Sequence, residues 1–138
     1  MRHEPVVRRD QYTGLTPVVA PEAVPPSPRR WSDAEWATIR RGRRAHEMDD
    51  KWVAFVEDDR LFLHRSWTGF GIYEARFARD DDGWFIAELL VSGDRDTYPR
   101  ASDSYEALSV EVVIDGVLLG QWHTEARARW RSMPREQA

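Results

Sequence analysis

The sequence predicts an α+β domain: an antiparallel sheet of about four strands, arranged as a meander, with a helix before it and a helix after it. Three observations lead to this fold class. Segments rich in β-branched and aromatic residues recur between residues 52 and 91, short polar turns separate them, and helix-start signals stand near residues 32 and 103. The turns are too short for the crossover that parallel neighbours need, so the strands should be antiparallel.

The length and composition fit one domain. A chain of 138 residues with 41% hydrophobic residues can bury one core. Without cysteine it has no disulfide framework and no cysteine-based zinc site. It holds neither an apolar run of membrane-spanning length nor a signal-peptide pattern after Met1, so we expect a cytoplasmic protein with no membrane partner.

The predicted domain covers residues 31–120. Residues 1–30 hold six of the eight prolines and show no apolar period, so a disordered, proline-rich arm is expected there. From Trp31 onward, Ser32 and Glu35 have the spacing of a capping box, which predicts a helix from about residue 32 to residue 46. Trp36 and Ile39 would form its apolar side.

Four strands follow, at about residues 52–57, 61–67, 70–79 and 84–91. Asp58-Asp59 suits a tight turn between the first two, and the run 80–83, which ends in glycine, suits a turn between the last two. Several of these strands carry apolar residues on both faces. We therefore expect partial cover on the second face of the sheet as well.

The second helix is predicted to begin at Asp103 as N-cap, with Glu106 three residues later. The run 108–119 fits either a helix or a hairpin turning at Asp115-Gly116. We favour the helix, because its start signal is strong and Gly120 supplies a stop. Residues 121–138 are expected to form a basic, frayed tail.

The charge distribution argues against nucleic-acid binding. Residues 48–120 carry sixteen acidic against seven basic residues, whereas residues 1–47 carry nine basic against six acidic and residues 121–138 four against two. Phosphate backbones need a coherent positive surface, which an acidic body with basic ends does not offer. We expect no nucleic-acid partner.

The candidate site is the polar end of the second strand, RLFLHRSWTGFG, over residues 60–71. His64 and Ser66 would share one strand face, and Arg65 and Trp67 the other. A guanidinium beside an indole suits an anionic, aromatic ligand such as a nucleotide. The structural alternative is that Trp67 fills the edge of the core and Arg65 stacks over it.

Two further sets of residues belong to this hypothesis. Thr68 follows in the turn, and Arg76 lies on the third strand. With Glu74 and Glu88, Arg76 could line a polar groove beside Arg65. The predicted ligand-binding residues are therefore His64, Arg65, Ser66, Trp67, Thr68 and Arg76.

Catalytic and metal patterns are weak. His64 and Ser66 resemble a base and a nucleophile, but neither a Gly-x-Ser-x-Gly elbow nor an orienting acid accompanies them. The run 46–50 collects metal-ligand residue types without a metal-binding spacing, and the aspartates at 80–82 lack the glutamate that closes a calcium loop. With neither a phosphate loop nor a dinucleotide glycine motif, we expect no cofactor and no metal.

Four segments resemble an uncharacterised family of small bacterial domains. They are MDDKW at 48–52, LFLHRSWTG at 61–69, IYE at 72–74, and Asp115 with LLG at 118–120, so the resemblance covers about residues 48–120. The HRSWTG core is its specific part. Members of that family occur alone or joined to macrodomains and ADP-ribosylglycohydrolases, which implies an ADP-ribose-related neighbourhood but no mechanism.

These observations lead to three functional hypotheses. The first is a small non-enzymatic binding or accessory module that recognises a nucleotide-like or ADP-ribose-like group. The second is a small hydrolase that acts on such a ligand. The third is an antitoxin-like domain whose aromatic surface meets a protein partner; a flat apolar patch would favour it, and exposed tryptophans around a polar cleft would favour the first.

Overall fold

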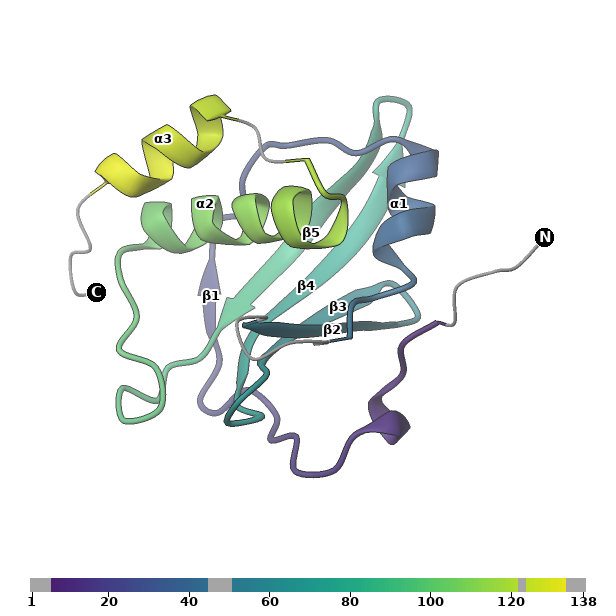
Figure 1. Ribbon diagram of the computed structural model, residues 1–138. Coiled ribbons are helices and arrows are strands. Elements are labelled where there is room, and N and C mark those ends of the chain that lie inside the picture. Colours follow the sequence, from purple (N-terminus) through teal and green to yellow (C-terminus); the bar gives the residue numbers. More distant parts are fainter. Residues whose placement is uncertain (1–5, 45–50, 122–123, 134–138) are drawn as a thin grey trace.

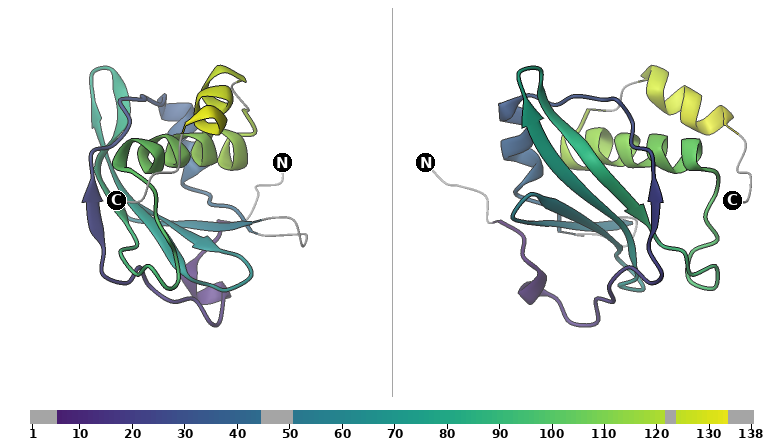
Figure 2. Two further views of the ribbon diagram at one scale, coloured as in Figure 1. Left: turned by 90° about the vertical axis from the view of Figure 1, so that its left-hand side faces the viewer. Right: turned by 180° about the vertical axis from the view of Figure 1, so that it is seen from behind.

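The computed structural model describes residues 6–44, 51–121 and 124–133, and it has the predicted α+β architecture. Five antiparallel strands form one sheet in the order β1-β5-β4-β3-β2. Helices α1 and α2 lie on one side of the sheet, and α3 packs outside α2 (Figures 1 and 2). The strands are β1 (Glu22–Val24), β2 (Trp52–Glu57), β3 (Arg60–Arg65), β4 (Gly71–Asp80) and β5 (Gly83–Val91). The helices are α1 (Asp33–Ile39), α2 (Asp103–Val113), α3 (Thr124–Ser132), a short 3-10 turn η1 (Arg9–Gln11) and a π-helical turn η2 (Ile114–Leu118).

The predicted meander is confirmed, and its first turn fixes the register of the site. Asp58 adopts a φ of 57°, a left-handed conformation that aspartate tolerates well in tight turns. This turn pairs Glu57 with Arg60 and, five residues further along each strand, Trp52 with Arg65. Strand β3 ends at Arg65, two residues before the predicted end.

The main core fills the space between the sheet and the helices. Its aromatic centre is Phe77, whose ring centroid lies 4.7 Å from that of Trp36 and 5.5 Å from that of Trp31. Trp36 also stacks on Trp84 at 4.7 Å. The helix prediction around Trp36 and Ile39 is therefore correct in the face that it buries.

The expectation of a disordered arm over residues 1–30 is wrong for residues 6–30. Residues 22–24 form β1, which pairs with the free edge of β5. Farther toward the N-terminus, Val7, Tyr12 and Leu15 cover the second face of the β2–β3 hairpin. Prolines exclude a helix in this segment, but they allow an extended chain that pairs with a sheet edge and buries isolated apolar side chains. We call residues 6–19 the N-terminal strap.

The strap packs on a small second core made by Val53, Phe55 and Phe62. The Arg9 guanidinium lies 4.8 Å from the Phe55 ring centroid and 4.7 Å from that of Phe62. Its Nε and Nη2 atoms also donate to the Glu57 carboxylate at 2.9 and 3.0 Å. The predicted partial cover of the second face is thus supplied by the strap.

Helix α1 ends at Ile39 instead of near residue 46. Gly42 turns the chain with a φ of +74°, and a Cβ atom there would lie 2.3 Å from the carbonyl oxygen of Ala54. The next residue, Arg43, pairs with Ala54 through two backbone hydrogen bonds of 2.8 and 2.9 Å. The chain therefore leaves the helix and pairs with the outer edge of β2. Glycine is needed at position 42 because the two backbones approach too closely there for a side chain.

The helical alternative for residues 108–119 is correct, since α2 continues into η2 and Gly120 follows with a φ of +68°. Two details differ from the prediction. The N-cap is Ser102, whose hydroxyl accepts from the Tyr105 amide at 3.3 Å, in place of Asp103. The tail predicted over residues 121–138 contains the helix α3, whose Trp130 docks on α2.

Candidate ligand-binding cleft

His64 is part of the second core. Its side chain is 1% exposed and stacks on Phe55 with a centroid distance of 5.4 Å. Its Nδ1 lies 3.0 Å from the carbonyl oxygen of Gly69. Burial disfavours the imidazolium and lowers the pKa of His64. These contacts give His64 a structural role in closing the β3–β4 connection.

Gly69, the last residue of the HRSWTG turn, also has a packing role. Gly69 has a φ of +77°, and a Cβ atom there would lie 2.3 Å from the carbonyl oxygen of Gly14 in the strap. The Gly69 carbonyl accepts from the Thr16 amide at 2.9 Å, and the Thr16 carbonyl accepts from the Gly71 amide at 2.8 Å. The strap therefore docks on this turn. Gly69 is needed there because a side chain would collide with the backbone of the strap.

Arg65 and Trp67 occupy different environments. The Arg65 guanidinium lies 4.3 Å from the ring centroid of Trp52, its cross-strand partner. Trp67 comes after the end of β3, in the turn, and is 73% exposed. Ser66 and Thr68 belong to the same turn. The cation–indole pair that the structure supports is Arg65 with Trp52.

Arg76 shares a sheet face with Glu74 and Glu88 as predicted, but this face is not the one that carries Arg65. The register places Glu74, Arg76 and Glu88 on one face of the sheet, as expected. On this face Arg60 binds the carboxylates of Glu74 and Glu88 at 3.3 and 3.0 Å. Arg65, however, stacks on Trp52 on the opposite face, so these residues do not form a groove beside Arg65.

A cleft of about 700 Å³ lies where the start of β2 approaches the end of α2 and helix α3. Its floor consists of apolar residues of α2 and η2 and of the glycines beside them. One wall comes from the chain beside and before β2, and the other comes from α3. The lining residues are Arg43, Lys51, Trp52, Val112, Val113, Gly116, Val117, Leu118, Leu119, Gly120, Arg127 and Trp130.

The charged residues in the described lining of the cleft are all basic. Three of its residues, Arg43, Lys51 and Arg127, are cations and two, Trp52 and Trp130, are tryptophans, while none of the described lining residues is acidic. The described lining is therefore basic, whereas residues 48–120 as a whole carry a large excess of acidic residues. Its volume is in the usual range for small-molecule sites.

The π-helical turn η2 shapes the floor of the cleft. It lies between α2 and Gly120, and its residues Gly116, Val117 and Leu118 all line the cavity. A π-helical turn widens the helix by one residue, and such turns are frequent at functional sites. Asp115 of the same turn is buried and accepts a 2.8 Å hydrogen bond from Trp31 Nε1, which ties η2 to the core.

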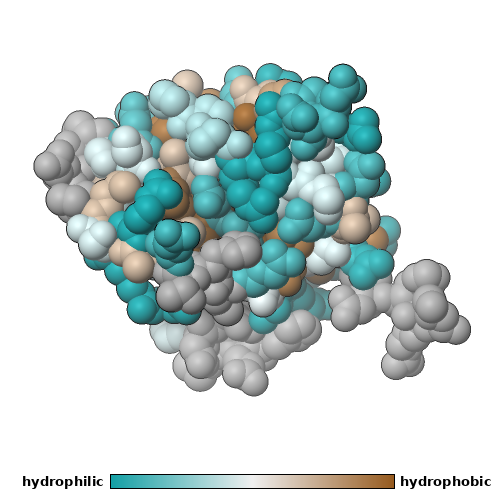
Figure 3. Space-filling model, turned by 90° about the horizontal axis from the view of Figure 1, so that it is seen from above, coloured by the Kyte–Doolittle hydropathy of each residue, from teal (hydrophilic) through white to brown (hydrophobic). Residues whose placement is uncertain are grey.

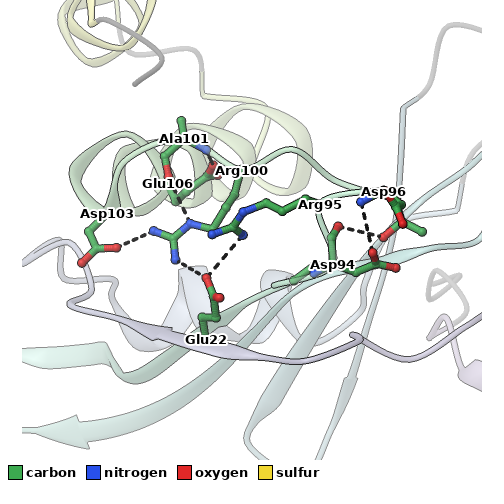
Figure 4. Close-up of polar contacts among 10 residues, drawn as sticks. Glu22, Asp94, Arg95, Asp96, Arg100, Ala101, Asp103 and Glu106 are labelled. Carbon is green, nitrogen blue, oxygen red and sulfur yellow. Dashed lines mark hydrogen bonds and ion pairs between the residues drawn. The ribbon is translucent and has the colours of Figure 1, made fainter. Parts of the chain in front are cut away.

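A second group of polar contacts, at the opposite end of α2, has a structural role (Figure 4). Buried Arg100 donates to Glu22 of β1 at 2.9 Å and also binds Asp103, and Arg95 reaches Glu22 at 3.5 Å. The hydrogen bond from Arg100 is the main reason why the pKa of Glu22 is lowered. These contacts join β1 to the loop before α2.

Next to it lies a buried carboxylate, Glu106. It accepts from the hydroxyl of Tyr73, from the hydroxyl of Tyr98 at 2.6 Å and from the amide of Ala101 at 2.6 Å. Burial raises the pKa of Tyr73 well above its ordinary value, so the Tyr73 hydroxyl keeps its proton and donates. Three donors satisfy this carboxylate, which fits a structural role in holding the loop to the sheet.

Two general results limit the chemistry. Among the described residues, no group of three histidines, aspartates or glutamates is placed to hold a metal ion. Across the same parts of the chain, the helices are all too short or too polar to cross a membrane. Residues 46–50, the weak metal candidates of the sequence, lie outside the described residues.

Comparison of the chain with family models, curated proteins and solved structures finds no match. The resemblance of residues 48–120 to a family of small bacterial domains thus stays a prediction. The class that the molecule itself defines is a small α+β domain with a basic, tryptophan-lined cleft.

Proposed function

We propose that the protein is a small non-enzymatic binding module whose cleft takes an anionic ligand with a flat aromatic ring, of the nucleotide-like or ADP-ribose-like kind. The observation that carries this proposal is the combination of three cations and two tryptophans, without an acidic residue, in the described lining of the cleft. Guanidinium and ammonium groups attract anions, and indoles offer stacking surface.

The stacked Arg65 supports the same proposal indirectly. Its guanidinium covers the Trp52 ring at 4.3 Å, and the Tyr73 ring lies 5.8 Å from Trp52 in a tilted arrangement. Two neighbours therefore hold the indole at the edge of the cleft. A preorganised ring loses less conformational entropy when a ligand binds.

The hydrolase alternative has less support. His64 is buried in the second core beneath the strap, whereas the cleft lies on the helix-covered side of the sheet. Its Nδ1 is engaged by the Gly69 carbonyl. A reaction built on His64 and Ser66 would need the strap and the turn to rearrange.

The protein-partner alternative depends on exposed apolar surface. Trp67 is the most exposed large hydrophobic residue of the described chain, at 73%. Seen from above, however, hydrophobic surface occurs in small areas among hydrophilic side chains, and the described part of this face carries no broad apolar patch (Figure 3). Among the described residues, the other exposed large hydrophobics are Val6 and Val19, so a protein partner would find few apolar anchors.

The test is calorimetric titration of the full-length protein with AMP, NAD and ADP-ribose. We expect at least one to bind, with an affinity that falls as salt is added, because exposed charges are screened. Lys51→Gln should weaken binding, and the matched variant Arg40→Gln, which removes an exposed cation outside the cleft lining, should not. If the wild-type protein binds none of the three ligands, the proposal fails and the protein-partner alternative replaces it.

A further inference from the structure

The two cleft residues of α3 indicate what the ligand must contain. We infer that the ligand is a phosphorylated nucleoside, a flat ring and a phosphate in one molecule, and that α3 recognises both parts through Trp130 and Arg127. The inference rests on the proposed function, since it assigns a ligand class to the same cleft. It also makes a separate prediction: the ring and the phosphate of the ligand contribute to the binding affinity through different residues.

The spacing of the two residues puts them on one side of α3. Residues three apart on a helix are neighbours on its surface, and both Arg127 and Trp130 line the cleft. The remaining arginines of the helix, Arg129 and Arg131, do not line it. Helix α3 therefore presents one cation and one indole to the ligand, side by side.

The indole of Trp130 is held in place from behind. Its Nε1 donates to the hydroxyl of Ser109 on α2 at 2.6 Å, and that hydroxyl donates to the carbonyl of Tyr105 at 2.8 Å. The Tyr105 ring lies 6.1 Å from Trp130 between centroids. Ser109 is itself buried, so the hydrogen bond fixes the edge of the indole while its ring contributes to the cleft wall. A fixed indole is the kind of platform on which a nucleobase stacks.

The cations are distributed for a group with more than one negative charge. Two hydrogen bonds to Ala54 fix the backbone of Arg43 beside β2, and Lys51 directly precedes that strand. Arg127 belongs to the opposite wall. A phosphate monoester carries between one and two negative charges and three acceptor oxygens, so it can engage cations from both walls, whereas a carboxylate has less charge and fewer acceptors.

The experiment compares three probes on the intact protein: AMP, adenosine and ribose 5-phosphate. AMP contains both parts of the expected ligand, and each of the others lacks one. We expect AMP to bind at least about tenfold more tightly than either, as expected for one base stack and one phosphate contact. This comparison uses only wild-type protein, so it stands even if a variant fails to fold.

Variants then assign the two parts. Trp130→Leu should reduce AMP affinity to about that for ribose 5-phosphate and leave ribose 5-phosphate binding unchanged, while Trp130→Phe should retain most of the AMP affinity. Arg127→Gln should reduce AMP affinity toward that for adenosine without reaching it, because Arg43 and Lys51 remain, and should leave adenosine binding unchanged. The matched control Arg131→Gln removes an exposed arginine of the same helix and should bind AMP as the wild type does. Ser109→Ala should weaken AMP binding but not ribose 5-phosphate binding.

The contradicting results separate this inference from the proposed function. If ribose 5-phosphate binds the wild type as tightly as AMP, the ring is not recognised and the inference is wrong, although the cleft still binds an anion. If adenosine binds as tightly as AMP, the phosphate is not recognised and the inference is wrong. If NAD or ADP-ribose binds but none of these three probes does, the inference is wrong and the proposed function stands. If no ligand of either experiment binds, the proposed function fails with it.

Discussion

Replacing Phe55 by alanine tests whether the N-terminal strap is part of the folded domain. Phe55 is fully buried between the hairpin and the strap, where it contacts Phe62 at 5.1 Å and His64 at 5.4 Å between ring centroids. Truncating a buried phenylalanine costs about 3–5 kcal/mol, and loss of the Arg9 cation–π contact adds about 0.5–1 kcal/mol. We expect the free energy of unfolding to fall by about 4 kcal/mol in a urea titration.

The matched control is Arg9→Gln, which removes the guanidinium and leaves Phe55 in place. Because the Arg9 side chain is 41% exposed, its ion pair with Glu57 is screened, and the loss should be about 1 kcal/mol. In the Phe55→Ala background the same change should cost less, since one of its two ring partners is gone. If Phe55→Ala costs less than about 1 kcal/mol, Phe55 faces solvent and the strap does not cover the sheet.

Three other changes have expected outcomes. Phe77→Ala should lower the free energy of unfolding by about 3–5 kcal/mol in the same titration, because Phe77 is buried against two tryptophans; a loss below about 1 kcal/mol would contradict the assignment of the sheet faces. Gly69→Ala should cost at least about 1–3 kcal/mol, because it places a Cβ atom at positive φ against Gly14, and an unchanged stability would mean that the turn and the strap are not in contact. Since burial lowers the pKa of His64 below 6.5, the unfolded chain takes up the proton first; the stability contribution is present above pH 6.5 and is lost as the pH falls through the pKa of the folded protein. Urea titrations between pH 7.5 and pH 5 should show this loss in the wild type and a smaller loss in His64→Gln. If the free energy of unfolding changes equally with pH in both proteins, the prediction is wrong.

The central meander was predictable because local signals agree with the fold. Residues 52–57 and 84–91 are strand-like in composition, and the turns at Asp58-Asp59 and at 80–83 fix their connections. The position of the first turn also determines the cross-strand partner of Arg65. Counting outward from the pair Glu57–Arg60 places Arg65 opposite Trp52, so the register could have identified this pair where strand alternation suggested Trp67.

The strap and β1 were not predictable in the same way. A strand of three residues between prolines has no periodicity of its own, and its pairing depends on the free edge of β5. The burial of Val7 likewise depends on a patch created by residues some fifty positions later in the chain. Local sequence indicates only that this segment is not helical.

The cleft is a product of tertiary structure. Arg43, Lys51 and Trp52 are close in the sequence, but Arg127 and Trp130 come from a helix that basic composition had suggested was a frayed tail. The docking of Trp130 is the part of this wall that the sequence does indicate, because a tryptophan in a polar segment usually packs against something. In the HRSWTG turn, by contrast, chemical character is a poor guide: His64 is buried against Phe55, Arg65 covers Trp52, and Gly69 meets the strap through its backbone.

We expect the ligand to bind in the cleft and not at the HRSWTG turn. The most direct test is a titration of uniformly ¹⁵N-labelled protein with AMP, followed through the indole N–H signals of its seven tryptophans, each assigned with a Trp→Phe variant. We predict that the signals of Trp52 and Trp130 shift, while that of Trp84, which donates to Asp33 at 2.8 Å, and that of Trp67 in the turn stay in place. A shift of the Trp67 signal with Trp52 and Trp130 unchanged would contradict the claim and return the site to the HRSWTG turn.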